Sequence, residues 1–255
     1  MPREVWERVL REVSPWVHTI QFFFQGEPLL NPHLAHMIRD AHANCIYTIL
    51  STNAQALTPD LAHELMRAGL NRIIVSIDGL RPESYGAYRV GGNLEKSLQA
   101  LRWLREAKQA THARCTIEMQ CLRLRTNETE WQEMQHRYRE LGADCLTLKT
   151  AQLYDFEHGH PLMPSDLRYA RYEQTKDGTY RLKRRRRIGC LRLWSGVVIT
   201  TTGEVLPCCY DKHADHALGN IMHESLQAIF HNEKARRFRS QALRFSPAIC
   251  HNCWQ

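Results

Sequence analysis

The 255-residue sequence contains no apolar run that approaches the roughly 20 residues needed to cross a bilayer. Its first ten residues, MPREVWERVL, carry too many charges for a signal peptide. Apart from a cationic run at 181–187, the sequence also lacks low-complexity segments. With 43% apolar residues the chain is globular and long enough for one large domain or two modest ones. We therefore expect a cytoplasmic protein with no membrane partner.

Three apolar segments end in polar residues at a spacing of about 25 residues. The segments FFFQGEP, IYTILSTN and RIIVSIDG bring the chain to Glu27, Asn53 and Asp78. This spacing fits one strand, one helix and two short loops, which is a βα unit of a parallel sheet. Because right-handed crossovers place the carboxyl ends of the strands at the same edge, we expect these three residues to converge on a ligand site there.

The remaining periodic segments extend this pattern. Further strands are expected at 114–124 and 145–149, and helices at 2–13, 34–41, 58–68, 93–104 and 127–141. The count is five strands and five helices over about 150 residues, beginning with a helix. The fold class is therefore α/β, a barrel-like parallel sheet over residues 1–152 without an opening strand.

The composition changes near Ala151. Residues 153–187 are polar and rich in His and Tyr without a clear period, which suggests a linker or an irregular segment that faces the substrate. The run at 181–187 holds six cations in seven residues. It predicts a solvated loop, or a dock for an acidic redox partner, an acidic peptide or nucleic acid.

Residues 188–255 form a smaller, cysteine-bearing unit of α+β type. The sequence VVITTTGEVLPCC predicts a hairpin with its turn at Thr202-Gly203, and a helix is expected at 225–238. The C-x-x-C turn at the end of the chain brings two sulfurs to one point, and the hairpin brings a third beside a fourth. The predicted four-thiolate set is Cys190, Cys208, Cys250 and Cys253. Iron–sulfur and zinc both accept this set, so the metal is left open.

The other five of the nine cysteines are expected to be ordinary thiols. Cys209 is a spare ligand or a bystander, and the remaining four lie on predicted strands, where small buried hydrophobic residues are expected. These four are Cys45, Cys115, Cys121 and Cys145.

The order of these motifs resembles that of radical S-adenosylmethionine (SAM) enzymes with a C-terminal SPASM or twitch extension. FQGEPLLNP is similar to the turn that holds the amino group of SAM in this family, and LSTNAQAL and VSIDGLRPESYGAYRVGG are similar to the next two strand-end motifs. The resemblance implies a (βα)6 partial barrel that lacks its first strand. It also implies that Gly26, Glu27 and Pro28 hold the amino group of SAM and that Asn53, Ser76 and Asp78 contact its ribose or methionine part.

CLRLWSGVVITTTGEVLPCCYD, LGNI and ICHNC are similar to the auxiliary-cluster domain of this family. The four predicted ligands would then hold a single 4Fe–4S cluster. Asp211, close to that cluster, is a candidate base for the substrate proton, and an ordinary turn residue is the alternative.

The sequence departs from the family in one respect. It contains no C-x-x-x-C-x-x-C motif, whose three thiolates leave one iron free to chelate SAM. We therefore expect that the chain as given does not cleave SAM. We also expect that Met1 is an internal start, since TIQFFFQ would otherwise be an uncovered apolar edge.

Three functions remain open from the sequence. The first is a radical SAM oxidoreductase or maturase that abstracts hydrogen from a peptide or small molecule, with an acidic electron donor such as flavodoxin or ferredoxin. The second is a non-catalytic iron–sulfur or zinc module that binds a peptide or relays electrons. The third is a zinc-stapled basic nucleic-acid binder, which is disfavoured because no aromatic residues interleave the arginines.

Overall fold

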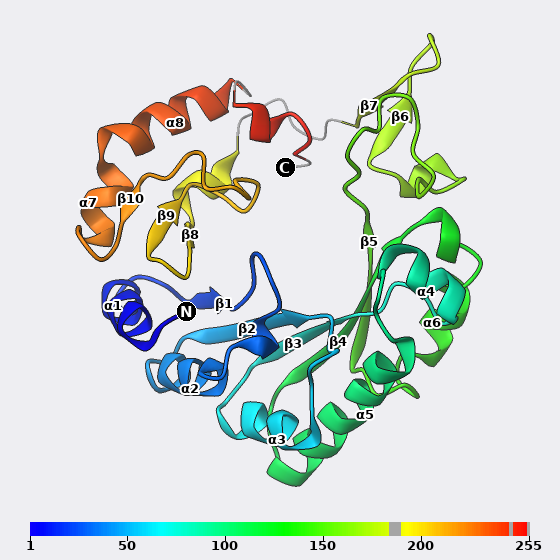
Figure 1. Cartoon of the computed structure of the whole chain (residues 1–255), viewed down its shortest axis with the longest axis horizontal. Helices are drawn as coiled ribbons and strands as arrows, with labels where there is room; N and C mark the ends of the chain where they lie inside the picture. The colour runs from blue at the N-terminus through cyan, green and yellow to red at the C-terminus, as the bar shows by residue number, and fades with distance from the viewer. Residues whose placement is uncertain (184–189, 245–246, 254–255) are drawn as a thin grey trace. The chain divides into compact units, whose positions relative to one another are not determined.

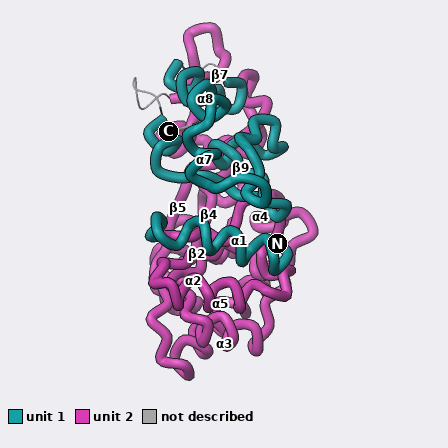
Figure 2. The backbone as a smooth tube through the Cα atoms, turned by 90° about the vertical axis from the view of Figure 1, so that its left-hand side faces the viewer, with its two compact units in different colours: residues 1–18, 184–255 teal, residues 19–183 magenta. Residues whose placement is uncertain are grey.

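A computed structural model describes residues 1–183, 190–244 and 247–253. They form two compact units, one of residues 19–183 and one that joins residues 1–18 to the segment after residue 183 (Figure 2). The functional boundaries at residues 152 and 188 stay a prediction. None of the helices in the described part of the chain is both long and apolar enough to span a membrane.

The unit of residues 19–183 is built on a five-stranded parallel sheet in the order β1-β2-β3-β4-β5 (Figure 1). The strands are β1 (Thr19–Gln21), β2 (Tyr47–Thr52), β3 (Arg72–Ser76), β4 (Thr116–Arg123) and β5 (Cys145–Thr150). Because neighbours in sequence are also neighbours in the sheet and all pairs are parallel, every connection is a crossover. The predicted α/β class is confirmed, and all five strand ends lie at one edge.

Helices cover one face of this sheet. They are α2 (Leu34–Ala43), α3 (Pro59–Arg67), α4 (Pro82–Tyr88), α5 (Leu94–Thr111) and α6 (Trp131–Arg137), with single 3-10 turns η1 (Pro28–Leu30), η2 (Arg125–Asn127) and η3 (Leu167–Tyr169). The strand residues beneath the helices are fully buried, as Leu50, Ile73 and Val75 show. The opposite face carries Ser51, Gln120 and other partly exposed side chains.

Three sequence predictions for this unit were wrong in detail. The first strand ends at Gln21, although Phe22 N still donates to Ile49 O at 2.8 Å. The helix expected from Asn127 begins only at Trp131, because the 3-10 turn η2 and three further residues precede it. The short helix α4, which starts at Pro82, was missed.

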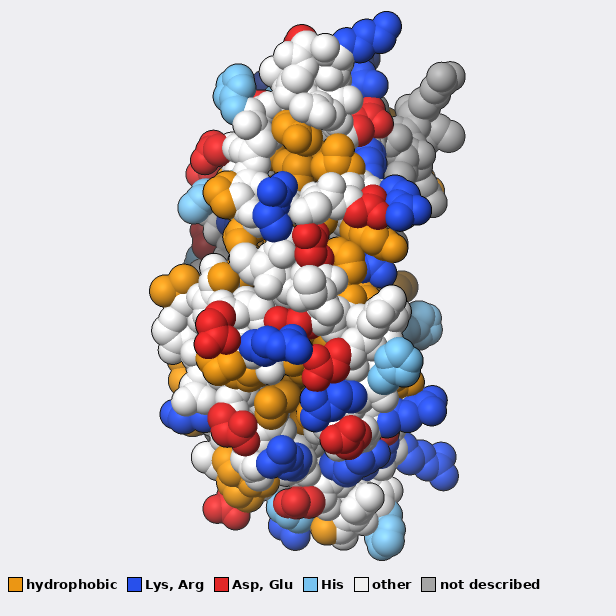
Figure 3. Space-filling model, turned by 90° about the vertical axis from the view of Figure 1, so that its right-hand side faces the viewer, with side chains coloured by type: hydrophobic (Ala, Val, Ile, Leu, Met, Phe, Trp, Pro, Cys, Tyr) orange, Lys and Arg blue, Asp and Glu red, His pale blue; other side chains and the backbone are white. Residues whose placement is uncertain are grey.

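Residues 151–183 carry structure that the sequence did not reveal. They contain the antiparallel hairpin β6 (Tyr172–Gln174) and β7 (Tyr180–Leu182). Tyr172 is fully buried, and its hydroxyl donates to Leu153 O at 3.0 Å and accepts from Leu153 N at 2.8 Å. Of the predicted cationic run, residues 184–187 lie outside the described residues. Elsewhere on this unit, acidic and basic side chains are interspersed (Figure 3), as in the pair Arg137–Glu133 at 2.7 Å.

The other unit combines the first helix with the cysteine-bearing segment. Its elements are α1 (Arg3–Val13), η4 (Leu191–Trp194), β8 (Val198–Ile199), β9 (Glu204–Leu206), β10 (Gly219–Asn220), α7 (Leu226–His231), α8 (Glu233–Leu243) and η5 (Ala248–Cys250). The predicted hairpin is present as β8 and β9, and Gly203 in its turn has φ +87°. A Cβ at Gly203 would meet Asn220 Oδ1 at 2.8 Å, so only glycine fits this turn.

The single helix expected at 225–238 is instead two helices. Asn232 is extended, with ψ 172°, and its Oδ1 accepts from Ala235 N at 2.9 Å. Its Nδ2 donates to Leu218 O at 2.9 Å. Asn232 therefore ends α7 and caps α8, because its side chain offers the backbone better partners than a continuous helix would.

Helix α1 is bonded to α7 and to the segment before it. Arg8 Nε donates to Ile221 O at 3.0 Å, and Glu12 Oε2 accepts from Leu226 N, the first residue of α7, at 2.9 Å. Arg8 and Glu12 also pair at 3.0 Å. A carboxylate at a helix amino terminus satisfies an N–H that has no partner within the helix. Glu12 therefore fixes α1 to the cysteine-bearing segment.

Candidate functional site

Glu27 lies at the predicted sheet edge and ties two strand ends together. Its Oε1 accepts from Thr52 Oγ1 at 2.5 Å and from Leu29 N at 3.1 Å, while its Oε2 accepts from Asn53 N at 2.9 Å. An ionised carboxylate has about four lone-pair sites. Three are used here, so about one remains for an ammonium group.

Asn53 is held in place by a second network on the same edge. Its Oδ1 accepts from Gln55 N at 2.9 Å, and its carbonyl oxygen accepts from Ser97 Oγ at 3.2 Å. Gln55 Nε2 donates to Ser97 Oγ at 2.8 Å and thereby links α5 to this loop. The expected meeting of Glu27 and Asn53 is confirmed by the bond between them.

Gly26 and Pro28 shape the turn around Glu27. Gly26 is exposed and has φ +80°, which favours glycine, and an added Cβ there would meet open space. Pro28 begins η1, whose N-cap is Glu27 itself. Glu27 therefore caps η1 and also contacts the end of β2.

Asp78 occupies the same edge but faces other partners. Its carboxyl is 1% exposed; Oδ1 accepts from Leu122 N at 2.6 Å and Oδ2 accepts from Arg89 Nε at 2.6 Å. Burial raises the pKa of this carboxyl, although Arg89 and the Leu122 amide act in the opposite direction. Asp78 thus joins the end of β3 to β4 and to the loop after α4. Its contact with SAM stays a prediction.

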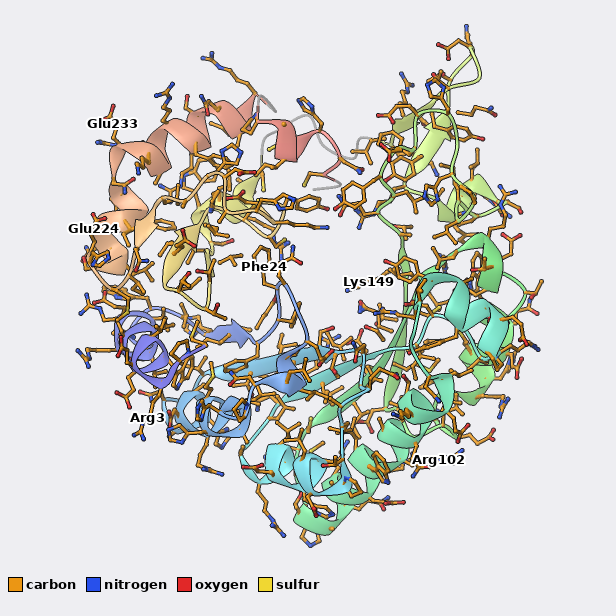
Figure 4. The ribbon with its side chains drawn as sticks, in the orientation of Figure 1. Arg3, Phe24, Arg102, Lys149, Glu224 and Glu233 are labelled. Carbon is orange, nitrogen blue, oxygen red and sulfur yellow. The ribbon has the colours of Figure 1, made fainter. Side chains whose placement is uncertain are left out.

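Ser76 begins a polar row across the face of the sheet opposite the helices. Ser76 is 9% exposed and lies opposite Gln120, which lies opposite Thr147. Gln120 Oε1 is buried and accepts no hydrogen bond from the described residues. Gln120 was not predicted from the sequence, although its place between the apolar Met119 and Cys121 on β4, both buried, was a usable signal. Phe24 and Lys149 project from the same side of the sheet (Figure 4).

The four predicted metal ligands line one pocket of the cysteine-bearing unit. Cys190, Cys208, Cys250 and Cys253 come from three separate segments, and the pocket is completed by apolar side chains, among them Phe238 of α8. Tyr210 N donates to Cys208 Sγ at 3.4 Å. The predicted juxtaposition of hairpin and C-x-x-C turn is therefore present, and ligation stays a prediction.

The chemistry of this pocket fits a cluster held by thiolates. Burial raises the pKa of both Cys208 and Cys250 to about 11, with neighbouring cysteines acting in the same direction. A bound cation would offset this crowding of sulfur atoms. Among the described residues, no three metal-binding side chains yet lie at ligand distances from a common point. The four thiols would hold a cluster only after their side chains move.

Asp211 lies three residues after Cys208 and is fully buried. Its Oδ1 accepts from Asp215 N and its Oδ2 accepts from His216 N, both at 3.0 Å. These bonds support the turn role that was weighed for it, and its role as a base stays a prediction.

Two of the four cysteines expected to be buried are not. Cys115 and Cys121 are 1% and 0% exposed, as expected, and burial raises the pKa of Cys115 to about 12. Cys145 is only partly buried. Cys45 is exposed, because it lies in the turn before β2 with φ +59° and not on the strand.

The fold and site define an α/β protein with a parallel sheet, a polar edge at the carboxyl ends of its strands, and a second unit in which four cysteines line one pocket. Residues 1–147 match the model of the radical SAM superfamily. Residues 190–254 match an iron–sulfur cluster-binding domain, SPASM. The chain belongs to the radical SAM superfamily and carries a SPASM extension. The cofactors of these families are SAM and 4Fe–4S clusters.

Individual relatives agree with this assignment. The GTP 3',8-cyclase of a Picosynechococcus species is 40% identical over 34% of this chain and 26% of its own length, so the chain matches about a quarter of that relative. The PqqA peptide cyclase of Rhizobium meliloti is 25% identical over 89% of this chain and 64% of its own length. Streptococcus suis SuiB, solved with the precursor peptide SuiA, shares the fold over 100% of this chain and 64% of its own, with a TM-score of 0.66 and 15% identity.

Proposed function

We propose that this chain is part of a radical SAM maturase that modifies a peptide. The observation that carries the proposal is the breadth of the likeness: PqqA peptide cyclase matches 89% of the chain and SuiB, solved with a precursor peptide, matches all of it. The sheet face opposite the helices carries the row of Ser76, Gln120 and Thr147, whose polar groups would bond to a peptide backbone.

SAM would lie at the sheet edge, and its bond cleavage would supply the radical that abstracts hydrogen from the peptide. Glu27 has about one acceptor site left for the ammonium group of SAM. Gly26 and Pro28 would fix the turn around this group. Asn53, Ser76 and Asp78 would take the ribose or methionine part of SAM.

The thiolates of Cys190, Cys208, Cys250 and Cys253 would hold a 4Fe–4S cluster. Four thiolates close a cluster and leave no site for SAM, so this cluster would serve electron transfer or organise the substrate. The electron donor would be an acidic carrier such as flavodoxin or ferredoxin, and the compartment would be the cytoplasm.

The absence of C-x-x-x-C-x-x-C from the sequence favours a second function for the chain as given. Without that motif it would act as a non-catalytic iron–sulfur relay or peptide-binding module. We expect such a protein to bind iron and peptide but to leave SAM intact.

Anaerobic purification followed by metal analysis tests the cluster. We expect a brown protein with about four iron and four sulfide ions, and loss of both in a Cys208→Ser, Cys253→Ser double variant. A colourless protein that contains one zinc ion would show that the four cysteines form a structural zinc site instead of a cluster site. Either metal result leaves the SAM proposal to be tested separately.

Equilibrium dialysis with labelled SAM, before and after addition of dithionite, tests the sheet edge. We expect Glu27→Gln to weaken SAM binding and Glu64→Gln, an exposed glutamate of α3, to leave it unchanged. Cleavage of SAM by the chain as given would contradict the relay function, whereas equal binding by both variants would contradict the role of Glu27.

A further inference from the structure

Strand β5 forms one edge of the parallel sheet. It pairs with β4 over its whole length, from Cys145 opposite Glu118 to Thr150 opposite Arg123, without a bulge. Of the described elements, only β4 packs along the length of β5. The chain then leaves β5 toward the hairpin β6–β7 rather than into a helix that would cover the edge (Figure 1). The outer side of β5 therefore has no neighbouring strand among the described residues.

This outer side presents backbone groups that can pair with a further strand. In a strand, successive residues turn their N–H and C=O groups to opposite sides, so about three of the six residues of β5 point these groups away from β4. Among the described residues, the backbone of residues 145–150 forms hydrogen bonds to no segment other than β4. The other edge strand, β1, has only three residues. The longer template for strand addition is therefore β5.

β5 carries little of what proteins use to block such an edge. It contains no proline and no bulge, and Lys149 is its one charged residue. None of its six residues is fully buried, whereas four of the five residues of β3 are. Leu146 and Leu148 lie opposite the buried Met119 and Cys121 but are themselves partly exposed. A strand added to this edge would cover both leucines.

The carboxyl end of β5 is positively charged. Lys149 is exposed and forms no ion pair with another described residue. It follows Thr147 by two residues, so its side chain lies on the same face as the row of Ser76, Gln120 and Thr147 (Figure 4). Arg171 donates from Nε to Thr150 Oγ1 at 3.3 Å and adds a second cation at this end. The ammonium group of Lys149 is therefore suited to a carboxylate of a ligand.

We propose that a segment of the substrate peptide, next to its reacting residue, binds to the outer edge of β5 as an extended strand and places an acidic side chain beside Lys149. The proposal rests on the proposed action on a peptide. Backbone hydrogen bonds to the edge give affinity for an extended chain, and Lys149 selects an acidic residue within it. A peptide is favoured over a nucleic acid, because only a polypeptide backbone presents N–H and C=O groups at the spacing of a strand.

Strand addition at β5 would also bring the peptide to the polar row. Side chains of a strand alternate between its two faces, so every second residue of the bound segment would lie on the face of Gln120. Gln120 Oε1 is buried and accepts no hydrogen bond from the described residues. The edge would thus hold the segment that flanks the reacting residue, while the polar row contacts the residues that lie over the sheet.

Peptides selected from a random display library against the anaerobically purified full chain test the role of Lys149 without measuring activity. We expect the selected peptides to contain Asp or Glu, and Lys149→Glu to weaken their binding about fivefold or more at low salt. This difference should largely vanish near about 0.5 M salt, where surface charges are screened. The matched control is Lys96→Glu, an exposed position within α5 with the same change of charge. Equal weakening by both variants would overturn the role of Lys149.

N-methylation of the selected peptide tests the backbone pairing and does not depend on how a variant folds. Methyl groups on alternate residues remove the N–H donors on one side of the strand, and only one side faces β5. We expect one of the two alternating patterns to weaken binding at least about tenfold and the other to have a much smaller effect. Hydrogen exchange of residues 145–150 should slow when the unmodified peptide binds, while that of residues 72–76 stays the same.

The outcomes separate the edge from the function beneath it. A peptide that binds with equal loss from both methylation patterns, or without slower exchange at residues 145–150, refutes strand addition and leaves the action on a peptide in place. A library that yields no bound peptide refutes both. A dimer in sedimentation whose formation protects residues 145–150 would assign the edge to a second copy of the chain and overturn the proposal. SAM binding and iron content, measured on the same samples, report the remaining proposed function independently.

Discussion

The contact between Glu27 and Asn53 offers the sharpest test of the site geometry. Glu27→Gln keeps the size of the side chain but leaves one oxygen, which can still accept from Thr52 and Leu29. The amide nitrogen then faces the N–H of Asn53, and two donors oppose each other. Loss of one hydrogen bond to a charged group costs about 1.5–3 kcal/mol. We therefore expect Asn53 N–H to exchange roughly 10- to 150-fold faster.

Hydrogen-exchange mass spectrometry on peptides that span residues 47–57 measures this local opening. Thr52→Val gives an internal contrast, because Ala54 N donates to Thr52 Oγ1 at 2.8 Å. In that variant the N–H of Ala54 should exchange faster, while the N–H of Asn53 keeps its bond to Glu27 and its protection. Glu64→Gln controls for the lost charge. Unchanged protection of Asn53 in Glu27→Gln would refute the geometry of this edge.

Three further predictions concern the stability of the two units. Burial raises the pKa of Cys115 from 9.0 to about 12, so the thiol ionises at lower pH in the unfolded chain, and the stabilisation from this group is complete below pH 9 and disappears as the pH rises toward 12. In urea unfolding, Cys115→Ala should therefore reduce the dependence of the unfolding free energy on pH in this window by up to about 1.4 kcal/mol per pH unit. An identical pH dependence in the variant would contradict the burial of Cys115. Glu12→Ala should destabilise the unit around α7 by about 1–3 kcal/mol in the same assay, against a negligible effect of the exposed Glu4→Ala, because Leu226 N–H loses its acceptor. Removal of iron with a chelator should raise hydrogen exchange in residues 190–253 and leave residues 19–183 unchanged; a uniform increase would argue against separate units.

The sheet could be predicted because its signal is repeated. Each buried strand reads as an apolar run followed by a polar residue, and the βα spacing recurs from Glu27 to Asp78. The hairpin at Gly203 could also be predicted locally, because its turn needs a residue with positive φ and glycine is the residue that most readily adopts it. The first strand was overestimated because hydrophobicity alone extends it to Phe24, whereas pairing with β2 ends near Phe22.

What the sequence concealed depends on single long-range contacts. In the segment at 151–183, Tyr172 bonds to Leu153, nineteen residues away, and both belong to one hydrophobic cluster that no local sequence period predicts. Asn232 lies within an apolar helical pattern in the sequence, but its Oδ1 accepts from Ala235 N and caps α8, while its Nδ2 donates to the distant Leu218 O.

Asp78 shows the same limit at the site itself. The sequence places it correctly at the end of β3, but its partners, Arg89 and Leu122, lie eleven and forty-four residues further along the chain. Both acids of this edge join strand ends, since Asp78 accepts two hydrogen bonds and Glu27 accepts three. They differ in burial: the Asp78 carboxyl is 1% exposed, whereas Glu27 is partly exposed and is the more accessible of the two to a ligand.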